Sequence, residues 1–170
     1  MKQALILVDY QNEWQDGSSE NYLGDLSGII DKTNKVIDFC RQDNTKIVFT
    51  QHIEKEEGNG FVQGAEGTEL ISTLHRQDSD AVVVKHKISP FYQTALDEVL
   101  EGVDKIIVCG ILTNMCVRSL VQDAYDRGFE IVVIKDCCRT YSEKTNIFTF
   151  EDLKETRPEI QFVNLEEFIK

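Results

Sequence analysis

Six short runs of aliphatic, mostly β-branched residues constrain the fold of this chain more than any other feature. Runs such as 106–108 and 131–134 are continuously apolar rather than alternating, which is typical of strands that are covered on both faces. The expected strands are residues 4–9, 46–51, 81–85, 105–110, 130–135 and 160–164. The pattern therefore predicts a mostly parallel sheet.

Amphipathic segments fill the gaps between these strands. From Leu26 to Cys40, apolar residues recur at three- and four-residue intervals, which predicts a helix capped by Asp25 or Ser27. Further helices are expected at residues 68–74, 94–100 and 115–125, with Gly128 ending the last of them. Alternating strands and helices indicate a doubly wound α/β fold with helices on both faces, in one domain spanning residues 1–170.

Residues 52–67 interrupt this alternation. The segment is rich in Glu and Gly and has no apolar period, so we expect a long surface loop. Within it, Glu54, Glu56 and Glu57 are expected to form a solvated acidic face. Loops of this length in compact domains often serve as lids or binding loops.

Charge and cysteine usage exclude several classes of function. The chain has 30 acidic and 18 basic residues and a net charge of −12, which disfavours nucleic acid and anionic membranes as partners. The first apolar run is too short for a signal peptide or a membrane span. Five cysteines without a regular spacing indicate free thiols in a reducing compartment, so we expect a cytoplasmic protein without structural zinc.

Three polar residues lie at or just beyond the carboxyl ends of predicted strands. Asp9 ends the first strand, Lys85 ends the third, and Cys116 follows the fourth at the start of a predicted helix. In an open parallel sheet this edge is where ligands bind. We expect Cys116 to be a nucleophile whose thiol pKa is lowered by Lys85 and the helix N-terminus, with Asp9 as the proton carrier.

Each of these residues alone has an ordinary explanation. A cysteine at a helix start is commonly a small packed hydrophobe, a strand-terminal Asp a turn residue, and a Lys a solvated charge. Cys40 and Cys109 are interpreted in this way, as core residues. The hypothesis therefore rests on Asp9, Lys85 and Cys116 meeting at one edge of the sheet.

Further side chains near these strand ends are candidates for the substrate pocket. His52 follows the second strand and is an alternative metal ligand, although the loop after it contains no second histidine. His86, next to Lys85, is expected to point to the opposite face if the strand continues. The residues expected to line the pocket are Gln11, Trp14, His52, Phe91 and Tyr92.

At these positions the sequence resembles the isochorismatase-like hydrolase superfamily, which includes nicotinamidases and N-carbamoylsarcosine amidohydrolase. The segments that carry the resemblance are ALILVDYQNEW, VVVKHKISPF and GILTNMCVRSLVQDAYDRGFEIVVIKD. They place a DxQN motif, a KxxxSxF motif and a GxxTxxCV motif in one order along the chain.

The resemblance implies a six-stranded sheet of order 3-2-1-4-5-6 and a catalytic triad of Asp9, Lys85 and Cys116. It also implies a non-proline cis peptide between Ile111 and Leu112, which would turn the N–H groups of Leu112 and Cys116 toward an oxyanion. No cofactor is implied. Members of the family commonly form homo-oligomers, and their substrates are small molecules.

The resemblance also bears on the substrate. Members that hydrolyse isochorismate lack the nucleophilic cysteine, so Cys116 favours an amide-type C–N bond. Nicotinamidases carry an Asp-x-His pair after the second strand, whereas this chain has residues 50–53, TQHI, there. Two alternatives remain at this point: a metal-dependent nicotinamidase that uses His52, and a non-catalytic thiol sensor or binding module on the same fold.

Overall fold

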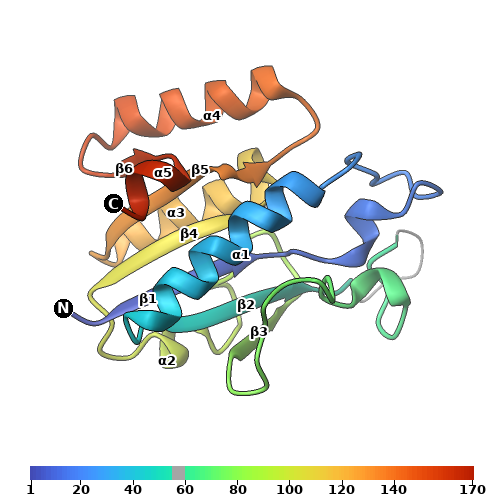
Figure 1. The fold of residues 1–170 in the computed structure, drawn as a ribbon, viewed down its shortest axis with the longest axis horizontal. Coiled ribbons are helices and arrows are strands. Elements are labelled where there is room, and N and C mark those ends of the chain that lie inside the picture. The colour runs from blue at the N-terminus through green and yellow to red at the C-terminus, as the bar shows by residue number, and fades with distance from the viewer. Residues whose placement is uncertain (55–59) are drawn as a thin grey trace.

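The computed structural model describes residues 1–54 and 60–170, and its centre is a six-stranded parallel sheet (Figure 1). The strand order is β3-β2-β1-β4-β5-β6, which confirms the predicted order. The strands are β1 (Gln3–Val8), β2 (Lys46–His52), β3 (Ala81–Lys85), β4 (Lys105–Ile111), β5 (Glu130–Arg139) and β6 (Gln161–Val163). The chain reverses its direction of winding between β1 and β4, and this is the point where doubly wound sheets bind ligands.

Helices cover both faces of the sheet, as predicted. The α-helices are α1 (Ser27–Gln42), α2 (Leu96–Val99), α3 (Arg118–Asp126), α4 (Glu143–Thr156) and α5 (Leu165–Phe168). Leu5 and Leu7 of β1 face a core shared with α1 and α5, whereas Ile6 and Val8 face a second core shared with α2, α3 and α4. This alternation of side chains explains why both faces of the central strands are apolar.

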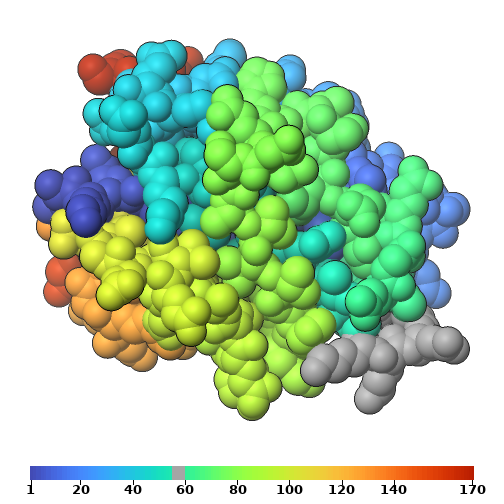
Figure 2. Space-filling view, turned by 90° about the horizontal axis from the view of Figure 1, so that it is seen from below, coloured from blue at the N-terminus to red at the C-terminus, as the bar shows by residue number. Residues whose placement is uncertain are grey.

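The edge strand β3 is an exception to this coverage. Its side chains at Val82 and Val84 are about 40% exposed, although the run is as apolar as those of the central strands. Figure 2 views the molecule from this side and shows the green residues that include β3 crossing the exposed face. An apolar run alone therefore does not distinguish an edge strand from a central one.

Several predicted helices differ from those in the structure. The helix expected at 68–74 is wrong: only a 3-10 turn, η2 (Glu66–Thr68), forms there. Leu70 instead pairs with Gln11 in an isolated antiparallel bridge, and the Ile71 N–H bonds to Tyr10 O, so these backbone groups are used outside a helix. The helix expected at 94–100 shortens to α2.

The segment expected to be one helix at 115–125 is divided in two. A π turn, η3 (Thr113–Val117), comes first and α3 follows it. Gly128 ends α3 with a φ of +83°, and its N–H bonds to Tyr125 O, as its predicted role requires. No helix was expected after Asp136, where α4 lies.

Two segments from distant parts of the sequence meet beyond the carboxyl ends of β1 and β2 (Figures 1 and 2). The first follows β1 and contains the 3-10 turn η1 (Asn12–Gln15), and the second contains η2. The Asn12 N–H bonds to Glu69 O, and Glu54 forms a bridge with Val62. The described part of the predicted loop is thus fixed against the sheet edge, whereas Glu56 and Glu57 lie outside the described residues.

In the described part of the chain, no helix has the length and apolar character needed to cross a bilayer.

Candidate active site

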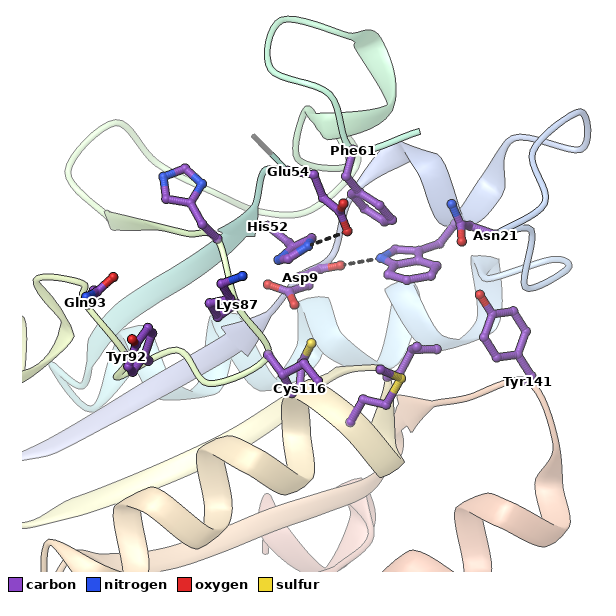
Figure 3. Close-up of a pocket in the computed structure, with 15 residues that line it drawn as sticks. Asp9, Asn21, His52, Glu54, Phe61, Lys87, Tyr92, Gln93, Cys116 and Tyr141 are labelled. Atoms are coloured by element: carbon purple, nitrogen blue, oxygen red, sulfur yellow. Dashed lines mark hydrogen bonds and ion pairs between the residues drawn. The ribbon is translucent and has the colours of Figure 1, made fainter. Parts of the chain in front are cut away.

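A cavity of about 710 Å³ opens at the carboxyl ends of the central strands (Figure 3). Its volume falls in the range of about 300–1,000 Å³ that is typical of small-molecule sites. Asp9 and Cys116 both line it, from opposite sides of the point where the sheet reverses. The other lining residues are Trp14, Asn21, His52, Glu54, Phe61, His86, Lys87, Ile88, Tyr92, Gln93, Leu112, Met115 and Tyr141.

Asp9 is fixed at the end of β1 by an unusual backbone conformation. Its φ of +54° lies in the left-handed region, which Asp tolerates better than most residues. The Asp9 N–H donates to Thr50 Oγ1 over 3.1 Å, and that hydroxyl donates to Asp9 Oδ1 over 2.6 Å. Trp14 Nε1 donates to Asp9 O over 2.7 Å (Figure 3). These bonds leave Oδ2 free to face Lys85.

The Lys85 ammonium links the other two members of the predicted triad. Nζ lies 2.8 Å from Asp9 Oδ2 and 3.3 Å from Cys116 Sγ. It also lies 3.1 Å from Lys87 O and 3.4 Å from His52 Nδ1. Burial lowers the pKa of Lys85, but the Asp9 carboxylate and Cys116 raise it by more, so the net pKa is raised and the side chain is a cation.

Cys116 occupies the π turn between β4 and α3. Leu112 O accepts hydrogen bonds from the N–H groups of both Met115 and Val117, at 3.1 Å each. Burial and the Asp9 carboxylate raise the pKa of the Cys116 thiol to about 12, although Lys85 lowers it in part. The expectation of a lowered thiol pKa is therefore wrong, because desolvation and the carboxylate outweigh the ammonium.

The peptide bond between Ile111 and Leu112 is cis, as the family resemblance implies. It lies at the end of β4, immediately before the π turn that carries Cys116. Ile111 is fully buried, whereas Leu112 reaches the cavity wall.

Three of the five residues expected to line the pocket do so: Trp14, His52 and Tyr92. Gln11 lies outside the cavity, because its side-chain amide bonds the segment after β1 to the end of β2. Its Nε2 donates to His52 O, and its Oε1 accepts from the His52 N–H, at 2.8 Å each. Phe91 also lies outside it. Its ring packs in the second core under the Arg127 guanidinium, which lies 4.0 Å from the ring centroid.

The side-chain direction of His86 was predicted only for a strand that continues past Lys85. Because β3 ends at Lys85, the alternation of side chains does not extend to His86, which lies at the cavity wall. Its Nδ1 donates to Ile53 O over 2.7 Å.

Several wall residues were not identified from the sequence. Asn21, Phe61 and Tyr141 come from segments between the regular elements and reach the cavity only through the fold. Phe61 packs against Trp14 with ring centroids 4.8 Å apart, which gives that side of the cavity an aromatic surface. In the sequence, these residues are marked only by their position in irregular segments that follow strands.

His52 contacts both the ion pair and the cavity wall. Its Nδ1 faces Lys85, and its Nε2 lies 3.4 Å from Glu54 Oε1. Burial lowers the pKa of His52, and Lys85 lowers it further, whereas Asp9 and Glu54 offset part of the shift. The ring is therefore neutral at physiological pH.

The fold and this cavity define a class of protein: a doubly wound α/β protein with a small-molecule site at the carboxyl edge of its sheet. The isochorismatase domain model matches residues 3–159. The chain therefore belongs to the isochorismatase family of hydrolases.

Individual relatives agree with this assignment. Nicotinamidase 3 of Arabidopsis thaliana is 27% identical over 165 residues, which cover 88% of this chain and 79% of the relative. The pyrazinamidase of Pyrococcus horikoshii, solved in complex with zinc, superposes with a TM-score of 0.86 at 24% identity, over 96% of this chain and 99% of that one. The N-carbamoylsarcosine amidase of Thermoplasma acidophilum gives 0.84 at 24% identity, over 97% of each chain.

A metal like the zinc of that pyrazinamidase does not fit the donors described here. In residues 1–54 and 60–170, no three His, Cys, Asp or Glu side chains are grouped as a metal site would require. The Nδ1 atom of His52 faces an ammonium, which repels a metal cation, and its Nε2 faces Glu54.

Proposed function

We propose that this protein is a cysteine amidohydrolase that cleaves the C–N bond of a small amide-type substrate. The observation that carries the proposal is the double contact of Lys85 Nζ, with Asp9 Oδ2 at 2.8 Å and Cys116 Sγ at 3.3 Å, beside a cavity of substrate size. Relatives at low identity that are named as nicotinamidase and amidase support a C–N bond as the target.

The raised thiol pKa determines how the first step proceeds. Cys116 Sγ attacks the substrate carbonyl carbon while its proton passes to the Asp9 carboxylate, since a resting thiolate is not available. The C=O electron pair moves onto oxygen, where the N–H groups of Leu112 and Cys116 are proposed to stabilise the negative charge. Lys85 stabilises charge on sulfur and on Asp9 throughout.

The remaining steps reverse this proton transfer. The C–N bond breaks, Asp9 returns the proton to the leaving nitrogen, and ammonia or an amine departs from the thioester. Water then attacks the thioester carbon, gives its proton to Asp9 and releases the acid, after which Cys116 regains its proton.

The substrate is small and neutral at its reacting amide. The cavity offers an aromatic wall formed by Trp14 and Phe61, and polar groups from Asn21 and Gln93. A pocket of this kind binds a compact organic body by its apolar faces and orients it by a few hydrogen bonds.

A thiol sensor is disfavoured by the same pKa. Redox sensors depend on a thiolate that reacts at neutral pH. A Cys116 thiol with a pKa near 12 lacks this property, whereas a base beside the sulfur, Asp9, is what a hydrolase requires.

The test is a screen of primary amides, carbamoyl compounds and cyclic imides for ammonia release by the purified protein. Nicotinamide is included, with and without a chelator, because a metal-dependent nicotinamidase would lose turnover on chelation. With the best substrate, Cys116→Ala should lower kcat by a factor on the order of 10⁵ or more while the urea midpoint stays close to that of wild type. Cys40→Ala, which removes a core thiol on α1, is the matched control and should retain turnover. Full activity of Cys116→Ala would refute the mechanism.

A further inference from the structure

The His52 ring lies between a cation and an anion. It ends β2 and is the register partner of Lys85 in β3. Its Nδ1 lies 3.4 Å from Lys85 Nζ. Its Nε2 lies 3.4 Å from Glu54 Oε1 (Figure 3). The Phe61 ring meets the imidazole edge to face with centroids 5.5 Å apart, which fixes the plane of the ring.

These two neighbours determine where the imidazole proton lies. An ammonium only donates hydrogen bonds, so Nδ1 must present its lone pair to Lys85. The proton of the neutral ring is then on Nε2, where it donates to the Glu54 carboxylate. Either the opposite tautomer or the doubly protonated ring would place an N–H against the ammonium.

We propose that His52 is a positioning residue for Lys85, kept by Glu54 in the tautomer with its proton on Nε2. The inference rests on the proposed function in one respect: Lys85 serves the reaction at Cys116. The ammonium has three N–H groups and lies within 3.4 Å of His52 Nδ1, Asp9 Oδ2, Cys116 Sγ, Lys87 O and Ile88 O. If Asp9 Oδ2 and Cys116 Sγ each accept one N–H, then His52 Nδ1, Lys87 O and Ile88 O share the third. An acceptor fixed at Nδ1 adds to the two carbonyls on that side and thereby keeps the other two N–H groups directed toward Asp9 and the sulfur.

The charged groups around His52 make this arrangement sensitive to acid. Lys85 of β3 opposes protonation of the ring, and Asp9 after β1 and Glu54 after β2 favour it. Cys116, His86 and Lys87 line the same cavity from the π turn and from the segment after β3. When His52 gains a second proton, Nδ1 becomes a donor and two cations face each other, so Lys85 must move away from it.

The first experiment needs no substrate. In ¹⁵N-labelled whole protein, long-range ¹H–¹⁵N correlation spectra identify the tautomer and the pKa of His52, whose signals are assigned by their absence in His52→Asn. We expect the proton on Nε2 and a pKa below the ordinary value of about 6.5. Glu54→Gln should lower the His52 pKa further, because it removes a charge that favours the imidazolium. A neutral ring protonated at Nδ1 would overturn the proposal, whatever the substrate.

The second experiment measures turnover with the substrate found in the screen. His52→Leu should lower kcat on the order of a hundredfold with little change in KM, because Lys85 loses its orienting acceptor while the cavity volume is kept. His52→Asn restores an acceptor near the Nδ1 position, so its kcat should be at least tenfold higher than that of His52→Leu. An equal loss in both variants, or a change in KM alone, would mean that His52 is only part of the wall. If His52→Leu does not fold, the proposal is still tested by the NMR result and by the comparison of His52→Asn with wild type.

The pH profile separates positioning from packing. Wild-type kcat should fall on the acid side as His52 is protonated, and this limb should be absent in His52→Asn and move to lower pH in Glu54→Gln. His75→Asn is the matched control, since His75 also pairs with a carboxylate, Asp38 at 3.0 Å, but lies outside the cavity lining. Its acid limb should match that of wild type. If no amide is turned over, the proposed function fails and the NMR result still tests the tautomer.

Discussion

Lys85 Nζ lies 2.8 Å from Asp9 Oδ2, and the two side chains are 0% and 1% exposed. An ion pair that is closed to solvent costs desolvation energy on both partners and is stable only while both remain. The folded state therefore depends on both charges of this pair, which is also part of the candidate active site. Substitutions of either residue are expected to change folding and catalysis together.

The first prediction concerns Asp9→Asn. The substitution keeps a side chain that tolerates a φ of +54°, so its effect isolates the loss of charge from backbone strain. Because the Lys85 ammonium is left buried without its partner, we expect a loss of about 3–5 kcal/mol in the free energy of unfolding, measured by urea denaturation. Turnover should also be lost.

The matched comparison is the double variant Asp9→Asn, Lys85→Met, in which neither charge is buried. The loss in free energy of unfolding in the double variant should be smaller than the sum of the losses in the two single variants, since the two residues contact each other. If the effects of the single substitutions simply add, the pair is not coupled, and the first prediction has the wrong physical basis.

The second prediction concerns stability at alkaline pH. Burial raises the pKa of Cys40 and Cys116 to about 12, and it raises the pKa of Cys109 and Cys138 in the same direction. Their pKa in the unfolded chain is about 8.5. The stabilising effect is therefore fully present below that value and is lost as the pH rises toward the folded pKa, because the unfolded chain releases its thiol protons first.

Each such thiol should lower the free energy of unfolding by about 1.4 kcal/mol per pH unit above roughly pH 9. Urea midpoints at about pH 8, 9 and 9.5, in the presence of a reductant, measure the slope below the ordinary lysine pKa of about 10.4. Cys40→Ala should reduce the slope by the share of one thiol. A midpoint that does not change over this range would contradict the buried, protonated thiols.

The parts of the fold that depend on local pattern could be predicted from the sequence. All six strands were placed within a few residues, because short apolar, β-branched runs separated by polar segments are typical of strands in an α/β sheet, at its edge as well as at its centre. Asp9, Lys85 and Cys116 were expected at one sheet edge because parallel strands bring their carboxyl ends together, and the distances around Lys85 Nζ agree with that expectation. The sheet order itself came from the family resemblance, since pattern alone does not determine it.

The parts that depend on long-range packing could not be predicted. The helix expected at 68–74 failed because Leu70 and Ile71 bond to the segment after β1, an interaction with no local signal. Phe91 and Tyr92 are adjacent aromatics, and only the fold decides that Tyr92 faces the cavity. The direction of the Cys116 pKa was wrong because charge proximity is visible in a predicted topology, whereas the depth of burial is not.

The last prediction concerns Gly67, which lies where the segments containing η1 and η2 meet. A Cβ at this position would lie 2.3 Å from Glu13 Oε2 and 2.9 Å from Gly60 O, closer than real Cβ contacts allow. Gly67→Ala must therefore displace the nearly buried Glu13 carboxylate. Glu13 Oε1 accepts hydrogen bonds from Ser19 Oγ and from Asn21 Nδ2, the latter over 3.1 Å, so these bonds would break as well.

Since Asn21 lines the cavity, the displacement should reach the substrate. We expect Gly67→Ala to cost about 1–3 kcal/mol in the urea measurement and to raise KM more than it lowers kcat. Gly17→Ala is the control, because a Cβ there has nothing within 4 Å. Adding Glu13→Asp, which shortens the displaced side chain, should restore part of the stability lost in Gly67→Ala. A wild-type KM in Gly67→Ala would show that the contact between η1 and η2 is not coupled to the cavity wall.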